Sequence, residues 1–131
     1  MPIDYTLSSA AKSISLSYDG KLLACSSSSV PTTVTVFNVS DGVMVAKLTA
    51  APGHVFGQVA FLPDQSLVIV ANRKDGVPNE IVQVKLDDTI VHRIPISESY
   101  IRYMAVSPKA AWISTASYDG SIHLVRMGTG K

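Results

Sequence analysis

The side chains that could support catalysis or metal binding are few and widely spaced along this sequence. The three histidines, His54, His92 and His123, are separated by 38 and 31 residues. A shared metal ion would also require Asp or Glu near them in one cleft. We therefore expect the histidines to fill surface or strand positions, and we predict no metal site.

Other chemically suggestive groups have simpler structural explanations. Cys25 is the single cysteine, and its place in an expected strand favours a packed thiol. Residues 128–131 read GTGK and resemble the end of a phosphate-binding loop, but Val125 stands where the first glycine of that loop must be. Asp87 and Asp88 are typical of a turn, because Asp side chains bond to nearby backbone there. The sequence thus predicts no catalytic residue and no cofactor.

Composition restricts the class of protein further. The chain has 131 residues, of which 47% are hydrophobic and 16% charged, and its formal net charge is +1. This composition favours one β-rich folded unit, and it argues against disorder and against direct binding of nucleic acid. No apolar run is long enough to span a bilayer, residues 1–4 lack the features of a signal peptide, and a single cysteine fits a reducing compartment. We expect an intracellular protein, cytoplasmic or nuclear, without membrane insertion.

A repeat of 45 residues organises the chain. The turn at residues 17–20 recurs at 62–65 and 107–110, with apolar positions at the same spacing on both sides. The matched positions are Ile14, Val59 and Met104; Leu16, Phe61 and Val106; Leu22, Leu67 and Trp112; and Leu23, Val68 and Ile113. Alternating apolar residues before the turn predict a strand with two different faces, and the more continuous apolar stretch after it predicts a strand covered on both sides. Each turn should therefore join a β-hairpin.

The second strand completes each hairpin, and further strands follow it. Second strands are predicted at 21–27, 66–72 and 111–117, third strands at 33–39, 81–86 and 121–127, and fourth strands at 43–48 and 89–94. Lys47 and Arg93 occupy equivalent places in the two fourth strands. The repeating unit is therefore four antiparallel strands, and no stretch has the apolar spacing of a helix.

Four strands in about 40 to 45 residues, repeated, are typical of a β-propeller blade. The sequence resembles the WD-repeat family across essentially its whole length. Residues 17–24, which read SYDGKLLA, resemble the family's turn and second strand, and residues 117–122, which read SYDGSI, resemble its second connection. Gly53-His54 resembles its Gly-His pair. The resemblance implies an all-β fold made of propeller blades with four antiparallel strands each.

The resemblance is to a degenerate repeat, and another propeller family is the alternative. The family's Trp-Asp dipeptide, which closes the third strand, is replaced in the three units by Phe37-Asn38, Lys85-Leu86 and Val125-Arg126. Only one Gly-His pair is present. The buried hydrogen-bonded tetrad typical of the family therefore cannot form as such in any blade.

The number of strands predicts three blades in an incomplete ring. We expect residues 1–131 to form a single propeller segment, with blades at about 12–48, 57–95 and 101–127 and with residues 3–7 as a leading outer strand. Since propellers have at least four blades, three leave two apolar faces and a strand edge uncovered. A second copy of the chain, a larger partner protein or a longer parent chain should complete the ring. We also expect Phe37, Phe61 and Trp112 to be buried between neighbouring blades.

The resemblance also implies a binding surface. In the family, two sets of loops share the face that commonly receives peptides or proteins, and here those loops are residues 52–56, 98–102 and 73–79. The candidate partner-binding residues on them are His54, Phe56, Arg73, Lys74, Tyr100 and Arg102. Arg and Tyr are enriched in interaction hot spots.

The predicted function is a non-catalytic propeller module that mediates protein–protein contacts as a scaffold subunit of a larger assembly. One alternative is a ligand-binding or enzymatic propeller with a polar funnel site, which the scattered histidines and carboxylates disfavour. A second alternative is a subunit of a nucleic-acid-associated complex, which the low charge disfavours.

Overall fold

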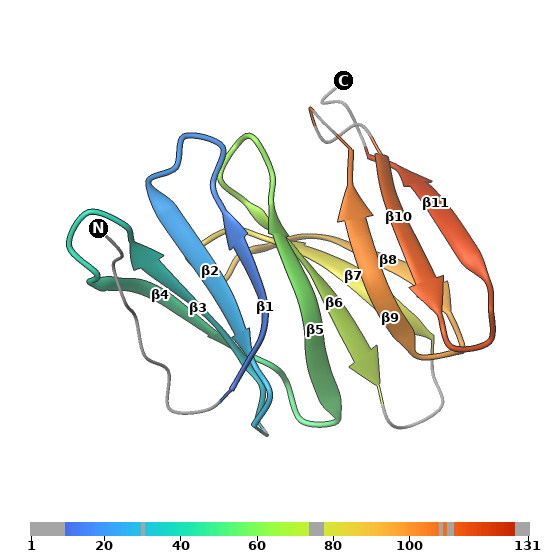
Figure 1. The fold of residues 1–131 in the computed structure, drawn as a ribbon. Coiled ribbons are helices and arrows are strands. Elements are labelled where there is room, and N and C mark those ends of the chain that lie inside the picture. Colours follow the sequence, from blue (N-terminus) through green and yellow to red (C-terminus); the bar gives the residue numbers. More distant parts are fainter. Residues whose placement is uncertain (1–9, 30, 74–77, 108, 110–111, 128–131) are drawn as a thin grey trace.

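The fold consists of three antiparallel sheets that stand side by side (Figure 1). The computed structural model describes residues 10–29, 31–73, 78–107, 109 and 112–127. Within these residues the chain forms eleven strands. The described part of the chain contains no helix of the length and apolarity needed to cross a membrane. The expected leading strand at residues 3–7 lies outside the described residues.

Each sheet is built from consecutive strands, so neighbours in sequence are neighbours in space. The N-terminal sheet contains β1 (Ala11–Leu16), β2 (Leu22–Ser27), β3 (Thr33–Asn38) and β4 (Met44–Thr49) in that order. The middle sheet contains β5 (His54–Phe61), β6 (Leu67–Arg73), β7 (Asn79–Val84) and β8 (Ile90–Ser97). The C-terminal sheet contains β9 (Ile101–Val106), β10 (Trp112–Ser117) and β11 (Ile122–Arg126). The expected all-β architecture of four-stranded antiparallel units is confirmed, with three described strands in the last unit.

The hydrophobic core lies between the sheets, and the middle sheet is covered on both faces. One buried cluster joins the N-terminal and middle sheets and includes Val34, Val36 and Phe61. A second cluster joins the middle and C-terminal sheets and includes Val68, Ile81 and Ile113. Because both faces of β6 and β7 are buried, these strands are apolar along most of their length, whereas β1 alternates.

The strand register confirms the 45-residue repeat in the first strand of each sheet and changes it after the turn. Leu16 pairs with Leu23 in the first sheet, and Phe61 pairs with Leu67 in the second. In the third sheet Val106 pairs with Ile113. The equivalent residues of the second strands are therefore Leu23, Leu67 and Ile113, with steps of 44 and 46 residues.

A turn that is one residue shorter in the middle sheet causes this change. The Ser17 amide donates to the Leu22 carbonyl at 2.9 Å, and the Ser107 amide donates in the same way to Trp112 at 2.9 Å. In the middle sheet the Leu62 amide donates to Ser66, also at 2.9 Å. Trp112 is therefore equivalent to Leu22, and not to Leu67 as the sequence spacing suggested.

This register explains the burial of the three aromatic residues expected between the sheets. Phe61 is 2% exposed, as expected. The expectation for Phe37 is wrong, because Phe37 is only half-buried and, next to the inward-facing Val36, lies on the outer face of the N-terminal sheet. The expectation for Trp112 is wrong, because its side chain is 40% exposed. Leu22 packs against the core shared with the middle sheet. Trp112, its equivalent, lies on the outer face of the C-terminal sheet, where the guanidinium carbon of Arg126 is 5.7 Å from its ring centroid and no further sheet of the described chain stands.

Candidate functional site

A group of aromatic and cationic side chains lies at one end of the C-terminal sheet. The rings of Tyr100 and Tyr118 are stacked, with centroids 5.5 Å apart and an interplanar angle of 29°. The guanidinium carbon of Arg102 lies 5.1 Å from the ring centroid of Tyr103 and 5.1 Å from that of Tyr118. All four side chains are exposed. We call Tyr100, Arg102, Tyr103 and Tyr118 the tyrosine–arginine cluster.

Backbone hydrogen bonds hold the two loops of this cluster together. The Tyr118 amide donates to the Tyr100 carbonyl at 3.0 Å, and the Asp119 amide donates to the Ser99 hydroxyl at 3.1 Å. Asp119 in turn accepts bonds from the hydroxyl of Ser121 at 2.6 Å and from its amide at 2.9 Å. These bonds, that of the hydroxyl first, hold the pKa of Asp119 below its usual value. The carboxylate form therefore fixes the turn that presents Tyr118.

Two buried asparagines of the middle sheet fix the same loops from the other side. The Asn72 side chain exchanges two hydrogen bonds with the backbone of Ile101, at 3.0 and 2.9 Å. The Asn79 side chain donates to the carbonyls of Ser97 and Ser99, at 3.2 and 2.8 Å. Because both asparagines are buried, the loop before β9 is anchored to a rigid sheet.

The cluster is suited to binding and not to proton transfer or nucleophilic attack. Stacked phenol rings offer flat apolar contact with hydroxyls at the edge, and the arginine offers hydrogen-bond donors to a carboxylate or carbonyl. Tyr and Arg are, with Trp, the residue types enriched in interaction hot spots. The arrangement can therefore hold an apolar or acidic segment of a partner.

Of the residues expected at a binding surface, the structure brings Tyr100 and Arg102 together. Arg73 is the last residue of β6, and Lys74 lies outside the described residues. The expectation that His54 and Phe56 lie on a loop is wrong, because β5 begins at His54. Their side chains line a pocket shared with the N-terminal sheet, which separates them from the cluster.

Sequence reasoning missed Tyr103 and Tyr118. Tyr118 stands in the segment SYDGSI, which was recognised only as a connection between strands. Tyr103 lies in β9, and its proximity to Tyr118 depends on the pairing of β9 with β10. The presence of Tyr in an exposed turn was the available signal for Tyr118, and no comparable signal marked Tyr103.

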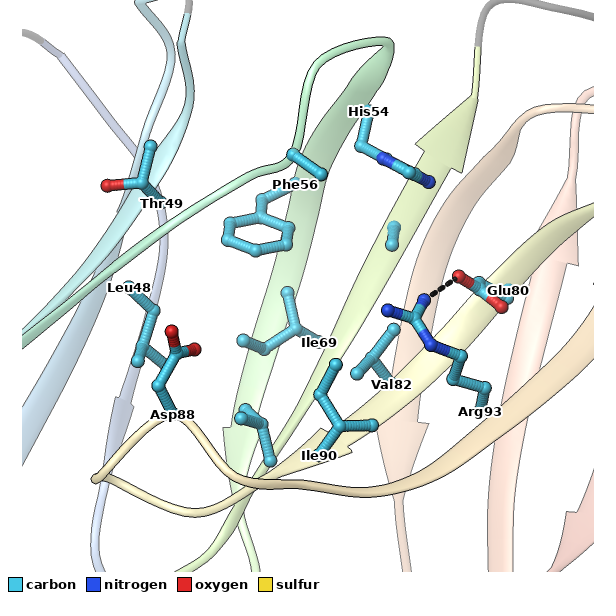
Figure 2. Close-up of a pocket in the computed structure, with 13 residues that line it drawn as sticks. Leu48, Thr49, His54, Phe56, Ile69, Glu80, Val82, Asp88, Ile90 and Arg93 are labelled. Carbon is cyan, nitrogen blue, oxygen red and sulfur yellow. Dashed lines mark hydrogen bonds and ion pairs between the residues drawn. The ribbon is translucent and has the colours of Figure 1, made fainter.

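Figure 2 shows the pocket between the N-terminal and middle sheets, with a volume of about 230 Å³. Most of its lining is apolar, including Leu48, Phe56 and Ile69. At one side the buried carboxylate of Glu80 accepts a hydrogen bond from the half-exposed Arg93 at 2.7 Å. Lys47 and Arg93 are equivalent in the strand pairing, as expected from the sequence.

The same pocket contains His54, whose two ring nitrogens are buried and have no hydrogen-bond partner among the described residues. An imidazole with an unused donor and acceptor can hold a ligand hydroxyl or amide. Glu80 lines the same pocket, but it is already paired with Arg93 and is therefore not available as a free base. In the described part of the chain no three His, Cys, Asp or Glu side chains lie close enough together to hold a metal ion.

Comparison with known protein families finds a match to one part of the chain. The family model described as "WD domain, G-beta repeat" matches residues 88–125, which extend from the turn before β8 into β11. No curated protein sequence matches the chain.

Many solved structures resemble the fold. A chain of a structure titled "Crystal Structure of Mitotic Checkpoint Complex" has a TM-score of 0.75 at 20% identity, over 92% of this chain and 37% of that one. The hydrazine synthase of Kuenenia stuttgartiensis gives 0.73 at 14% identity, over 87% and 39%. A structure of the dihydro-heme d1 dehydrogenase NirN gives 0.64 at 17% identity, over 90% and 26%. The chain therefore spans less than two fifths of the length of each of these proteins.

The architecture and the matched repeat lead to one conclusion about the fold. The chain is a WD-repeat-like β-propeller segment, and its three sheets stand as neighbouring blades of an open arc.

Proposed function

We propose that this chain is a non-catalytic propeller module that mediates protein–protein contacts as a scaffold subunit of a larger assembly. The observation that carries the proposal is the tyrosine–arginine cluster, in which Arg102 lies over two exposed tyrosine rings. The exposed cluster combines the residue types that dominate interaction energies, and two buried asparagines hold its loop in place. Pre-organisation of this kind reduces the entropy lost on binding.

Composition supports a protein partner over a nucleic acid. A net charge of +1 gives little attraction for phosphates, while the stacked tyrosines offer apolar area with a polar edge. The single cysteine, Cys25, is free and buried, which suits an intracellular setting. The partners we consider are other proteins, including a second copy, a larger partner or further blades of a parent chain.

A matched pair of variants tests the proposal. Tyr100→Ala combined with Tyr118→Ala removes the stack. Tyr18→Ala removes an exposed tyrosine of the same local sequence, SYDG, from the turn between β1 and β2 of the N-terminal sheet. Proteins that co-purify with the natural chain should bind the double variant at least about 30-fold more weakly, the effect of losing about 2 kcal/mol at a hot spot. They should bind Tyr18→Ala unchanged. Equal binding by all three chains would contradict the role of the cluster.

The pocket around His54 favours a second candidate function, the binding of a small ligand or of one partner side chain. Its volume of about 230 Å³ is below the roughly 300 to 1,000 Å³ of most small-molecule sites. A fragment screen followed through the ¹H–¹⁵N signals of the His54 ring tests this function. Fragments that shift those signals and lose binding in His54→Phe would support it, and a screen without such fragments would count against it.

A further inference from the structure

The two outermost sheet faces of the arc carry large apolar side chains that the described residues leave exposed. On β11 of the C-terminal sheet, Ile122 is 77% exposed and Leu124 is 65% exposed. On β1 of the N-terminal sheet, Ile14 is 65% exposed and Leu16 is 59% exposed. Contiguous apolar surface of this kind usually marks an interaction site.

The strand pairing identifies what covers the same positions elsewhere in the chain. Leu124 pairs with Ser114 as Val36 pairs with Ala24, and Ile122 pairs with Ala116 as Val34 pairs with Ser26. On the other outer face, Ile14 is equivalent to Val59 and Leu16 is equivalent to Phe61. Val34 and Val36 are fully buried by the middle sheet, and Val59 and Phe61 are buried by the N-terminal sheet. The contact between two neighbouring sheets thus has two complementary halves, and each end of the chain displays one of them.

Polar contacts between the sheets recur with the same spacing. The Val59 amide donates to the hydroxyl of Ser13 at 3.2 Å, and the Met104 amide donates to the side-chain oxygen of Gln58. Ser13 and Gln58 are 45 residues apart, and Tyr103 follows at the next step. Ile14 is the residue of the N-terminal sheet that is equivalent to Val59. The Tyr103 hydroxyl is therefore at the position that accepts a bond from the Ile14 amide of a neighbouring N-terminal sheet.

A cationic contact follows the same rule. The ammonium group of Lys12 donates to the carbonyl of Phe56 on the next sheet at 3.1 Å. Arg102 lies two repeats after Lys12, in β9 of the C-terminal sheet. Ala11 lies one repeat of 45 residues before Phe56, so its carbonyl is the equivalent acceptor on an N-terminal sheet. Arg102 and Tyr103 thus supply the polar groups for contact with another β1 strand.

We infer that the outer face of the C-terminal sheet binds the outer face of the N-terminal sheet of a second copy of this chain. Two copies arranged head to tail form two identical contacts related by a two-fold axis, and their six blades close a ring within the known range of four to eight. A second copy fits because both halves of the contact are present in one chain. This inference rests on the proposed protein-binding role and names the partner of the two faces.

The first experiment measures the mass of the purified 131-residue chain by sedimentation equilibrium over a range of concentrations. The expected result is a reversible dimer of twice 13.9 kDa. Leu124→Lys and Ile14→Lys should each weaken the dimer by at least about 100-fold, because each places an unpaired charge in an apolar contact. Val91→Lys replaces an exposed apolar residue on β8, away from both faces, and should leave the dimer unchanged.

Mixing the two weakened variants separates the head-to-tail arrangement from others. A pair formed by one Leu124→Lys chain and one Ile14→Lys chain has one contact without either substitution, so the mixture should dimerise more tightly than either variant alone. A symmetric contact that uses the same face twice would leave one of the two single variants fully dimeric. Circular dichroism verifies that each variant retains its strands.

Trp112 gives an independent readout, because it is the single tryptophan and lies on the C-terminal outer face. Its emission should move to shorter wavelength, and its quenching by iodide should fall, as the natural chain dimerises; Leu124→Lys should not show this change. A folded monomer with exposed Trp112 at every concentration would overturn the inference, as would a dimer insensitive to Leu124→Lys and Ile14→Lys. Loss of partner capture by the Tyr100 and Tyr118 variants is scored separately, so failure of one proposal does not decide the other.

Discussion

The side chain of Asn72 forms a closed pair of hydrogen bonds with the backbone of Ile101, 29 residues further along the chain. Its amide nitrogen donates to the Ile101 carbonyl at 3.0 Å, and its oxygen accepts from the Ile101 amide at 2.9 Å. The Asn72 side chain thereby bonds to the backbone at the start of β9 as a neighbouring strand would. The contact joins the middle sheet to the segment that carries Tyr100 and Arg102.

Replacement of Asn72 by Ala should therefore destabilise the fold. The buried amide and carbonyl of Ile101 lose their partners, which costs about 1 to 3 kcal/mol for each unsatisfied group. Urea unfolding followed by circular dichroism measures the effect. Asn72→Asp retains an acceptor for the Ile101 amide but buries an unpaired carboxylate against the Ile101 carbonyl, so it should lose more stability at neutral pH than Asn72→Ala loses. A midpoint equal to that of the natural chain in both variants would contradict this account.

Phe61 and Phe37 provide a matched comparison of burial. Phe61→Ala removes a side chain that is fully enclosed between the N-terminal and middle sheets, so the free energy of unfolding should fall by about 3 to 5 kcal/mol. Phe37→Ala changes a half-buried residue on the outer face of the N-terminal sheet and should cost clearly less. Equal losses in the two variants would mean that the outer face is covered in solution.

Stability should fall in acid because of the aspartates at the turns. Hydrogen bonds lower the pKa of Asp64, mainly from the Ser66 hydroxyl, and that of Asp87, mainly from the Thr89 side chain. Asp119 behaves in the same way. A folded-state pKa below the unfolded value means that the contribution is complete above about pH 4 to 5, near the unfolded pKa of Asp, and is lost as pH falls through the folded pKa.

Unfolding midpoints in urea at several values between pH 7 and pH 2.5 test this expectation. The midpoint of the natural chain should decrease below about pH 4. Asp64→Asn removes one titrating group and should reduce the steepness of the decrease. A midpoint independent of pH over this range would show that the turns do not depend on charged aspartates.

The ion pair between Glu80 and Arg93 should contribute to the stability of the fold, because the Glu80 carboxylate is buried. Arg93→Ala leaves Glu80, which is 7% exposed, without its cation and should cost about 3 kcal/mol or more, since an uncompensated buried charge is costly. Glu80→Gln leaves a neutral amide and should cost less. Combining Arg93→Ala with Glu80→Gln in a double-mutant cycle should recover part of the loss, and strictly additive losses would contradict direct coupling.

The repeat in the sequence was sufficient to predict the three units, their antiparallel strands and the order of those strands. Local physics explains this success, because alternating apolar residues, Asp-Gly turns and the spacing of hairpins act within one unit. The match of the family model to residues 88–125 and the similarity to propeller structures agree with that prediction. Blade boundaries and the proposed partner contacts remain predictions.

Sequence spacing could not decide which face each side chain occupies. A turn one residue shorter in the middle sheet reverses the facing of the residue that follows it, because side chains alternate along a strand. Leu67 therefore faces the opposite way from Leu22 and Trp112, which share one facing. Trp112 is exposed for a different reason, because it lies on the outer face of the C-terminal sheet, where no further sheet stands in the described part of the chain.

The sequence by itself determined the β-strand units and the number of repeats, since these depend on short-range patterns. The tertiary structure decided that Tyr100, Arg102, Tyr103 and Tyr118 form one cluster, and that His54 and Phe56 line a pocket elsewhere. These contacts depend on hydrogen bonds such as those between Asn72 and Ile101, which join residues from different sheets. Local sequence patterns do not mark which residues of different sheets come into contact, and these contacts set which surface the chain presents to a partner.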